Sequence, residues 1–289
     1  MNTIGSKADR AAEKHENKTS GHGIVARAAG KALDLVFPQN IYCLCCGDTM
    51  ESSRIHGICD KCAEKINWLD HDPFRASLED FAFDHVLSCC VYGFYPRRIM
   101  HDLKLHGKPY IARSIGPLMA EKVLTETALT GGVYTALIPV PCTAAKRRKR
   151  GYNQAELLAK YAAKQLGLPV WTDVLIKTKE TPSMRLSTGE ERRNLMQGVF
   201  AVDQNTCAKL PGADILLVDD VLTTGSTADA CARTLKDAGA RTVTVLCFAS
   251  SARAFEPEWE RETNEPEADA GVAAQRQSGR SAAERRAYN

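Results

Sequence analysis

The stretch that decides the fold is Ile215-Leu216-Leu217-Val218-Asp219-Asp220-Val221-Leu222-Thr223-Thr224-Gly225-Ser226-Thr227. Its first four residues are apolar, as in a short buried strand, and two carboxylates follow directly. A loop of threonine, glycine and serine comes next, and a helical pattern begins at its end. Because ligands of open parallel sheets bind at the carboxyl ends of the strands, the stretch predicts a ligand site there.

The side chains of this stretch favour a phosphorylated sugar. Backbone N–H groups of a loop that opens a helix attract an anion such as phosphate, and Gly225 permits close approach or a positive φ. The carboxylates of Asp219 and Asp220 accept hydrogen bonds, which suits the vicinal hydroxyls of a ribose. Alternatively, the two Asp residues cap a turn and Ser226 or Thr227 caps the helix. That alternative explains single residues but not the whole string in order.

The flanking sequence alternates apolar strands with helical patterns. Strands are expected at Val86–Tyr92, Tyr134–Val140, Ile215–Val218 and Thr242–Phe248, and helices at Tyr110–Leu124, Gln154–Leu166 and Thr227–Ala238. This alternation predicts an α/β fold, with a parallel sheet covered by helices on both faces.

Cysteines are clustered in a second region. Two C-x2-C pairs, separated by twelve residues, are formed by Cys43, Cys46, Cys59 and Cys62. This spacing predicts a structural zinc site, because one tight turn presents each pair of sulfurs and a closed four-thiolate site leaves no open position for catalysis. A segment of ~30 residues cannot build a core alone, so the metal would supply folding energy. The alternatives are an iron–sulfur cluster, free thiols, or exchange of a ligand for Cys45 or His56.

Composition places the chain among ordinary globular proteins. It has 289 residues, of which 44% are hydrophobic and 25% charged, and this excludes a wholly disordered chain or a collagen. The formal net charge is only +3, so attraction to nucleic acid requires local patches. No apolar run approaches the ~18 residues of a membrane span, and no secretory signal is evident, which favours the cytoplasm. In that reducing compartment, clustered cysteines are interpreted as metal ligands. The six cysteines outside the cluster are expected to be core residues: Cys89, Cys90, Cys142, Cys207, Cys231 and Cys247.

The chain divides into four parts by composition. We expect a flexible leader with a candidate short helix over residues 1–38 and a zinc-binding module over residues 39–72. The α/β domain is expected over residues 85–250, and a disordered tail over residues 251–289.

A basic run, Lys146-Arg147-Arg148-Lys149-Arg150, precedes the helical pattern at Gln154. It has three interpretations: it holds a diphosphate, it follows a nucleic-acid backbone, or it is a solvated charge run. Other cations and aromatic residues that would join a nucleic-acid surface are Arg97, Arg98, Lys104, Lys108, Arg113, Trp68, Tyr95 and Tyr152.

The stretch 215–227 resembles the phosphoribosyl pyrophosphate (PRPP) motif of type I phosphoribosyltransferases. Within that group the sequence is most similar to the ComF/ComFC competence family, which joins a four-cysteine zinc module to a phosphoribosyltransferase-like domain. Three further segments carry this resemblance, which spans residues 41–250: the PVP and RGxNQ sequences within Ile138–Gln154, the LKxxG sequence within Tyr92–Gly107, and Arg192–Phe200. One departure is Met184, where the family usually has Gln.

The resemblance implies a role for each matched residue. Asp219 and Asp220 would hold the ribose hydroxyls of PRPP, and residues around Lys177–Gln197 would form a mobile hood over the site. The 5-phosphate would be wrapped by Thr223, Thr224, Gly225, Ser226 and Thr227. The pyrophosphate loop would comprise Val140, Pro141 and Cys142, with Lys146 or Arg147 facing a diphosphate that Mg²⁺ bridges. Arg148, Lys149 and Arg150 remain candidates for binding DNA.

These features lead to one principal hypothesis and two alternatives. The principal hypothesis is a ComF-type protein that binds PRPP and acts in natural transformation. There it handles incoming single-stranded DNA in the cytoplasm, beside competence proteins such as a DNA-translocating helicase. One alternative is a metabolic enzyme that transfers phosphoribose to a base or amine. The other is a zinc-ribbon interaction module with a degenerate domain. Turnover is not assigned, because the sequence shows no general base for an acceptor.

Overall fold

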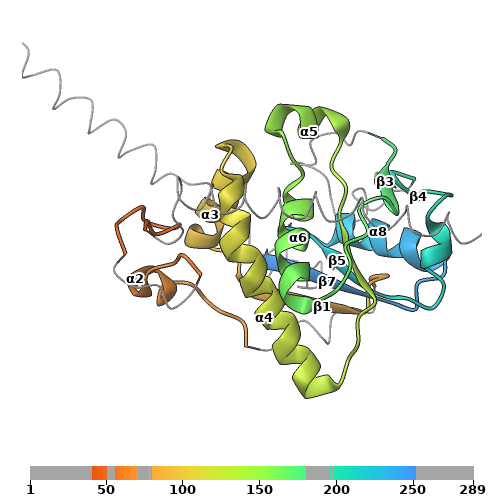
Figure 1. The fold of residues 1–289 in the computed structure, drawn as a ribbon, viewed down its shortest axis with the longest axis horizontal. Helices are drawn as coiled ribbons and strands as arrows, with labels where there is room; N and C mark the ends of the chain where they lie inside the picture. The colour runs from red at the N-terminus through yellow and green to blue at the C-terminus, as the bar shows by residue number, and fades with distance from the viewer. Residues whose placement is uncertain are drawn as a thin grey trace, which may run out of the picture. The chain divides into compact units, whose positions relative to one another are not determined.

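The computed structural model describes residues 41–50, 56–70, 78, 80–179, 196 and 198–251 (Figure 1). It divides into two compact units, and the boundary falls between Glu64 and Lys65. The expected leader, the expected tail beyond residue 251, and most of the expected hood, including Met184, lie outside the described residues.

The first unit is built from two short turns. An antiparallel bridge joins Tyr42 to Thr49, and it closes the turn that contains the first C-x2-C pair. Gly47 adopts φ +84°, which a residue with a side chain rarely adopts. The second pair lies at helix α2 (Asp60–Ala63), whose N-cap is Cys59.

A parallel sheet forms the centre of the second unit. Its strands lie in the order β1 (His85–Val91), β7 (Thr242–Ser250), β5 (Asp214–Val218) and β2 (Ala136–Pro139), and β6 (Val221–Leu222) also pairs with β7. Every pairing in this sheet is parallel. All of β5 is buried, as expected for a strand covered on both faces. The α/β fold predicted from the sequence is confirmed.

Helices pack on both faces of the sheet. These are α4 (Ala112–Thr130), α6 (Gln154–Leu166) and α8 (Ser226–Asp237). The chain also forms α3 (Phe94–Leu105), which buries part of one face, and the short helix α5 (Ala144–Arg150), which has no buried residue. Ile215 and Leu217 belong to the same core cluster as Cys231 and Leu235 of α8. The alternate residue Leu216 points to the opposite face and is also fully buried. Figure 1 shows α4 and α6 side by side over the sheet.

Close packing of α4 against α6 depends on Gly116. A Cβ atom at this position would lie 2.5 Å from Cβ of Tyr161 and 3.1 Å from the backbone oxygen of Leu158. Helix α4 begins two residues later than expected, because a 3-10 turn over Pro109–Ile111 precedes it.

The outer strands of the sheet are covered by short extended segments. Along β1, Val91 N–H donates to Asn67 O at 2.8 Å and Leu69 N–H donates to Cys89 O at 3.0 Å. Along β2, Trp171 N–H donates to Leu137 O at 2.9 Å. A separate two-stranded antiparallel sheet joins β3 (Leu175–Lys177) to β4 (Phe200–Val202). In the described part of the chain, no helix combines the length and apolarity needed to cross a membrane.

Candidate functional site

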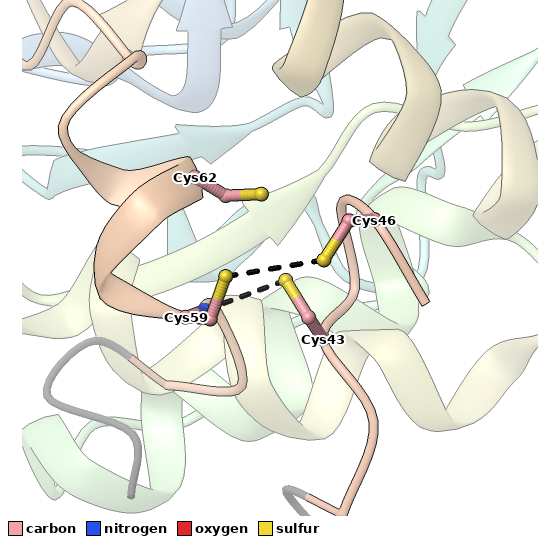
Figure 2. Close-up of side chains that lie close together, drawn as sticks. All are labelled: Cys43, Cys46, Cys59 and Cys62. Carbon is pink, nitrogen blue, oxygen red and sulfur yellow. Dashed lines mark hydrogen bonds between the residues drawn. The ribbon is translucent and has the colours of Figure 1, made fainter. Parts of the chain in front are cut away.

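The four cysteines of the two C-x2-C pairs converge in the first unit (Figure 2). The sulfur atoms of Cys43, Cys46, Cys59 and Cys62 all lie within 4.8 Å of one another. The Sγ atoms of Cys46 and Cys59 are 3.9 Å apart. A tetrahedral zinc ion with Zn–S bonds of about 2.3 Å requires sulfurs about 3.8 Å apart. The donor set and its spacing therefore fit a zinc ion.

Two backbone N–H groups donate to one of these sulfurs. Cys43 Sγ accepts N–H groups from Cys45 and Cys59, each at 3.4 Å. Burial alone would raise the pKa of Cys43, but these donors lower its pKa to about 6. Cys45 is buried outside the group, and its pKa is raised to about 12 by burial and by the neighbouring Cys43. Among the described residues, the sulfur group includes neither Cys45 nor His56.

The second unit has a cavity of about 590 Å³ at the carboxyl ends of its strands. Its lining includes the residues after β5 and β2, the start of α6, and side chains from α3, α5, β3 and α8. The residues are Lys104, Val140, Pro141, Cys142, Lys146, Arg150, Asn153, Gln154, Ala155, Lys177, Asp219, Asp220 and Thr227. Four cationic side chains thus surround two carboxylates, which leaves an excess of positive charge for an anionic ligand.

The acid pair is held by its own backbone and by a lysine. Asp219 Oδ1 accepts the N–H of Asp220 at 2.8 Å, and Asp220 Oδ1 accepts the N–H of Val221 at 2.7 Å. Lys104 Nζ lies 2.8 Å from Asp220 Oδ2. Desolvation and the adjacent Asp220 raise the pKa of Asp219 to about 7, while Lys104 opposes that rise. The pair therefore contains one carboxyl group that titrates near neutral pH.

The loop after the acid pair leads directly into helix α8. Gly225 is the N-cap with φ +76°, and among the described residues no side chain caps this helix. Thr224 and Ser226 hydroxyls lie 3.1 Å apart. Helix N–H groups without a capping side chain are suited to a phosphate. Of the five loop residues expected to hold the 5-phosphate, Thr227 lines the cavity.

A segment from before the sheet supports this loop. A Cβ atom at Gly225 would lie 2.7 Å from Cε1 of Phe81. The neighbouring Ala82 N–H donates to the Asp229 carboxylate of α8 at 2.6 Å. Gly225 is thus required both by its positive φ and by the aromatic ring against it.

The basic run forms the short helix α5, which Thr143 caps through the N–H of Lys146. Lys146 and Arg150, one turn apart, line the cavity. Arg147 instead forms an ion pair with Glu156 at 3.2 Å. Arg148 and Lys149 are exposed and do not belong to the cavity lining. The five consecutive basic residues, which look alike in the sequence, therefore have different surroundings in the structure.

Several residues that line or support the cavity were not singled out from the sequence. Asn153 caps α6 and donates from Nδ2 to Val140 O at 3.0 Å, which links the helix to the loop after β2. Gln154, at the start of the same helix, also lines the cavity. Of the residues that the resemblance did assign, Lys177 of the expected hood and the half-buried Cys142 of the expected pyrophosphate loop belong to the lining. The expected core positions of Cys89, Cys90, Cys231 and Cys247 are confirmed, whereas Cys207, like Cys142, is half-buried.

Comparison with known proteins agrees with this architecture. Residues 153–273 match the phosphoribosyl transferase domain family. Competence protein F of Haemophilus influenzae is 26% identical over 222 residues, which cover 71% of this chain and 95% of that protein. Competence protein ComFC of Bacillus subtilis is 25% identical over 214 residues, covering 72% and 83% respectively. The chain is a homologue of the ComF/ComFC competence proteins.

This ComF homologue also matches DNA utilization protein YhgH of Escherichia coli O157:H7. The identity is 29% over 151 residues, or 52% of this chain and 65% of that protein. The resemblance inferred from the sequence motifs is thereby confirmed. The matched domain region of this ComF homologue contains the acid pair, the loop and Thr227.

Proposed function

We propose that this ComF homologue binds PRPP with Mg²⁺ in the cavity and serves DNA uptake, in which it handles single-stranded DNA in the cytoplasm. The observation that carries the proposal is the arrangement of charge at the strand ends. Two carboxylates lie beside four cationic side chains in one cavity, next to the N-terminus of α8. A ligand that combines a diol with phosphate groups at both ends matches this arrangement.

Each part of the cavity takes one part of PRPP. Asp219 and Asp220 accept the ribose hydroxyls, and the loop from Thr223 to Thr227 surrounds the 5-phosphate with N–H and hydroxyl groups. The diphosphate lies against Val140 and Pro141, with Lys146, Arg150 and Lys177 as its cationic partners. Mg²⁺, which prefers phosphate and water oxygens, neutralises part of the diphosphate charge.

Calorimetric titration of Mg²⁺–PRPP tests this function. The wild-type protein is expected to bind saturably, and Asp219→Asn/Asp220→Asn is expected to lose binding while it keeps its fold. At a ligand concentration 100 times Kd, bound PRPP adds about 2.7 kcal/mol to the free energy of unfolding, which a thermal melt measures independently. Absence of binding by the wild-type protein contradicts the proposal.

Transfer of phosphoribose to an acceptor is the alternative function. The preserved acid pair and loop favour it, because charge stabilisation around a departing diphosphate is the main requirement for that chemistry. Pyrophosphate release from PRPP, measured with nucleobases and with ammonia, distinguishes an enzyme from a protein that only binds PRPP. Release that requires Asp219 and Asp220 supports the alternative.

The DNA role is supported by the names of the relatives and by the outward part of α5. Arg148 and Lys149 are exposed and lie outside the cavity lining. Fluorescence anisotropy with a single-stranded oligonucleotide is expected to show weaker binding by Arg148→Ala/Lys149→Ala. Its salt slope should fall by about 0.7 for each lost phosphate contact. The matched control is Lys160→Ala/Lys164→Ala, which removes two exposed cations from α6. Equal weakening in both variants contradicts a specific role for α5.

We also propose that Cys43, Cys46, Cys59 and Cys62 hold a structural Zn²⁺. The support is their mutual spacing and the N–H groups directed at Cys43. Zinc content of the purified protein, measured by mass spectrometry, is expected to be one ion per chain.

A further inference from the structure

Lys104 forms an ion pair with the acid pair inside the cavity. Its Nζ atom lies 2.8 Å from Asp220 Oδ2, and both side chains line the cavity. The side chains are only 33% and 9% exposed. Because salt screens partly buried charges much less than exposed ones, this contact differs from an ordinary surface ion pair.

Lys104 acts on both carboxylates. Burial opposes its charge, but Asp220 and then Asp219 raise the pKa of Lys104 above its usual value. In return, Lys104 offsets part of the effect of desolvation and of Asp220 on the pKa of Asp219. The lysine therefore relieves the repulsion between two adjacent carboxylates that share a shielded site.

The surrounding structure keeps Lys104 in place. It lies near the C-terminus of α3, where a cation is favoured by the helix dipole. Ile99, Met100 and Leu103 anchor the other face of this helix in the core. The Tyr152 hydroxyl donates to the backbone oxygen of Leu103, which ties the helix to the chain between α5 and α6.

Each of the two oxygens of Asp220 has a partner of its own. Oδ1 accepts the N–H of Val221 and Oδ2 contacts Lys104. The carboxylate cannot rotate without losing one contact, yet each oxygen keeps a lone pair for a further donor. A carboxylate that accepts hydrogen bonds from two hydroxyls at fixed positions needs both this fixed orientation and these remaining lone pairs.

The geometry points to Lys104 as a positioning residue, whose ammonium orients the Asp220 carboxylate toward the hydroxyls of a ribose phosphate. This inference rests on the proposed function, and it separates the four cations of the cavity into two groups. Lys104 serves the acid pair, whereas Lys146, Arg150 and Lys177 serve the diphosphate.

Calorimetry with two probes tests this separation. Ribose 5-phosphate carries the diol without a diphosphate, and magnesium pyrophosphate carries the diphosphate without the diol. Lys104→Met is expected to weaken ribose 5-phosphate binding about tenfold, as for loss of one charge-assisted contact. Pyrophosphate binding is expected to change by less than about twofold. Lys104→Arg keeps the charge and is expected to restore most of the ribose 5-phosphate affinity.

The matched control is Lys108→Met. Lys108 also pairs with an aspartate, Asp102, at 2.6 Å, but neither residue belongs to the cavity lining. This variant is expected to bind both probes as the wild type does. An equal loss of both probes in Lys104→Met, or no rescue by Lys104→Arg, overturns the positioning role.

A double-mutant cycle keeps the test decisive if Lys104→Met alone is unstable. Asp220→Asn removes the partner of Lys104, so the second change is expected to add less than about twofold to the loss of ribose 5-phosphate affinity. Additive losses overturn the inference. If the wild type binds ribose 5-phosphate and Lys104→Met binds it equally, only the inference fails. If the wild type binds neither probe nor PRPP, the proposed function fails and the inference with it.

Discussion

The cysteine group and the sheet-end cavity bring together side chains that suit ligands of opposite charge. Four thiols lie within 4.8 Å of one another in the first unit, an arrangement that could hold a cation, whereas four cationic side chains line the cavity of the second unit and favour an anion. Among the described residues of the first unit, the helical structure beside the thiols is the four-residue helix α2. The cavity lies at the end of a buried sheet covered by helices. Under the two proposals, the metal ion would stabilise the fold of the first unit, whereas the ligand of the second unit would bind to a fold that its own core already stabilises.

Removal of zinc is expected to have the largest effect, and to unfold the first unit while the second unit stays folded. Binding of structural zinc supplies about 10–16 kcal/mol in small metal-held modules, so a strong chelator should unfold residues 41–64. Hydrogen exchange followed by peptide analysis should show lost protection there, while the strands of the second unit stay protected.

The ligand set of this site is tested by two neighbouring cysteines. Cys46→Ala is expected to lose the ion, whereas Cys45→Ala keeps it, because Cys45 is buried outside the sulfur group. Equal loss of zinc in the two variants, or unfolding of both units by the chelator, breaks the comparison.

Gly116→Val tests the second unit in the opposite way, because it disturbs the packing of two helices and leaves the metal ligands of the first unit unchanged. The added Cβ atom meets Tyr161 Cβ at 2.5 Å, so α4 and α6 must separate. Overpacking of this kind costs roughly 1–3 kcal/mol, and the melting temperature of the second unit should fall by about 2–4 °C for each kcal/mol. Zinc content should stay unchanged. The control is Gly132→Val, whose Cβ atom would meet only the Thr130 hydroxyl at 3.3 Å; an equal fall there contradicts the explanation.

Asp219→Asn is expected to stabilise the empty protein at neutral pH while it weakens ligand binding. The pKa of Asp219 is raised to about 7 in the folded state, so the folded protein binds its proton more tightly than the unfolded chain does. Wild-type stability therefore falls as pH rises from about 4 to about 7, and then levels off. The variant should be more stable by on the order of 1 kcal/mol at pH 8 and show no advantage below pH 4. Chemical denaturation at several pH values measures this, and an advantage that grows toward low pH contradicts it.

Phe81→Ala is expected to have the smallest effect. Loss of the ring leaves space against Gly225 and allows the phosphate loop to move. Affinity for ribose 5-phosphate should fall by a few fold, on the order of 1 kcal/mol, as for loss of a supporting contact. Phe94→Ala removes an aromatic ring that is 73% exposed and serves as the control. Unchanged affinity in Phe81→Ala shows that the loop holds its own conformation.

Local patterns in the sequence predicted much of the fold and part of each site. The apolar run before Asp219 corresponds to β5 almost residue for residue, and the helix expected over Gln154–Leu166 has these bounds in the structure. The spacing of the cysteines predicted the sulfur group, because two short turns bring both pairs together without distant segments. These features depend on periodicity and spacing, which are properties of the local sequence.

The contacts between side chains in the cavity could not be predicted from local periodicity and spacing. Lys104 reaches Asp220 from a helix more than a hundred residues earlier in the sequence. The signal for that helix was present in the apolar positions Ile99, Met100 and Leu103, but it does not specify a partner. Similarly, the basic run has one composition throughout, and only the orientation of α5 decides that Lys146 lines the cavity while Arg147 meets Glu156.

The short segment Asn67–Leu69 beside β1 has a consequence for where the chain can be divided. An outer strand with unpaired N–H and C=O groups invites pairing with another molecule, and this segment occupies those groups on Val91 and Cys89. A fragment that begins at Lys65 retains its own cover and should remain monomeric in light scattering. A fragment that begins at Asp80 presents a bare strand, and it should self-associate although its sheet, helices and cavity are complete.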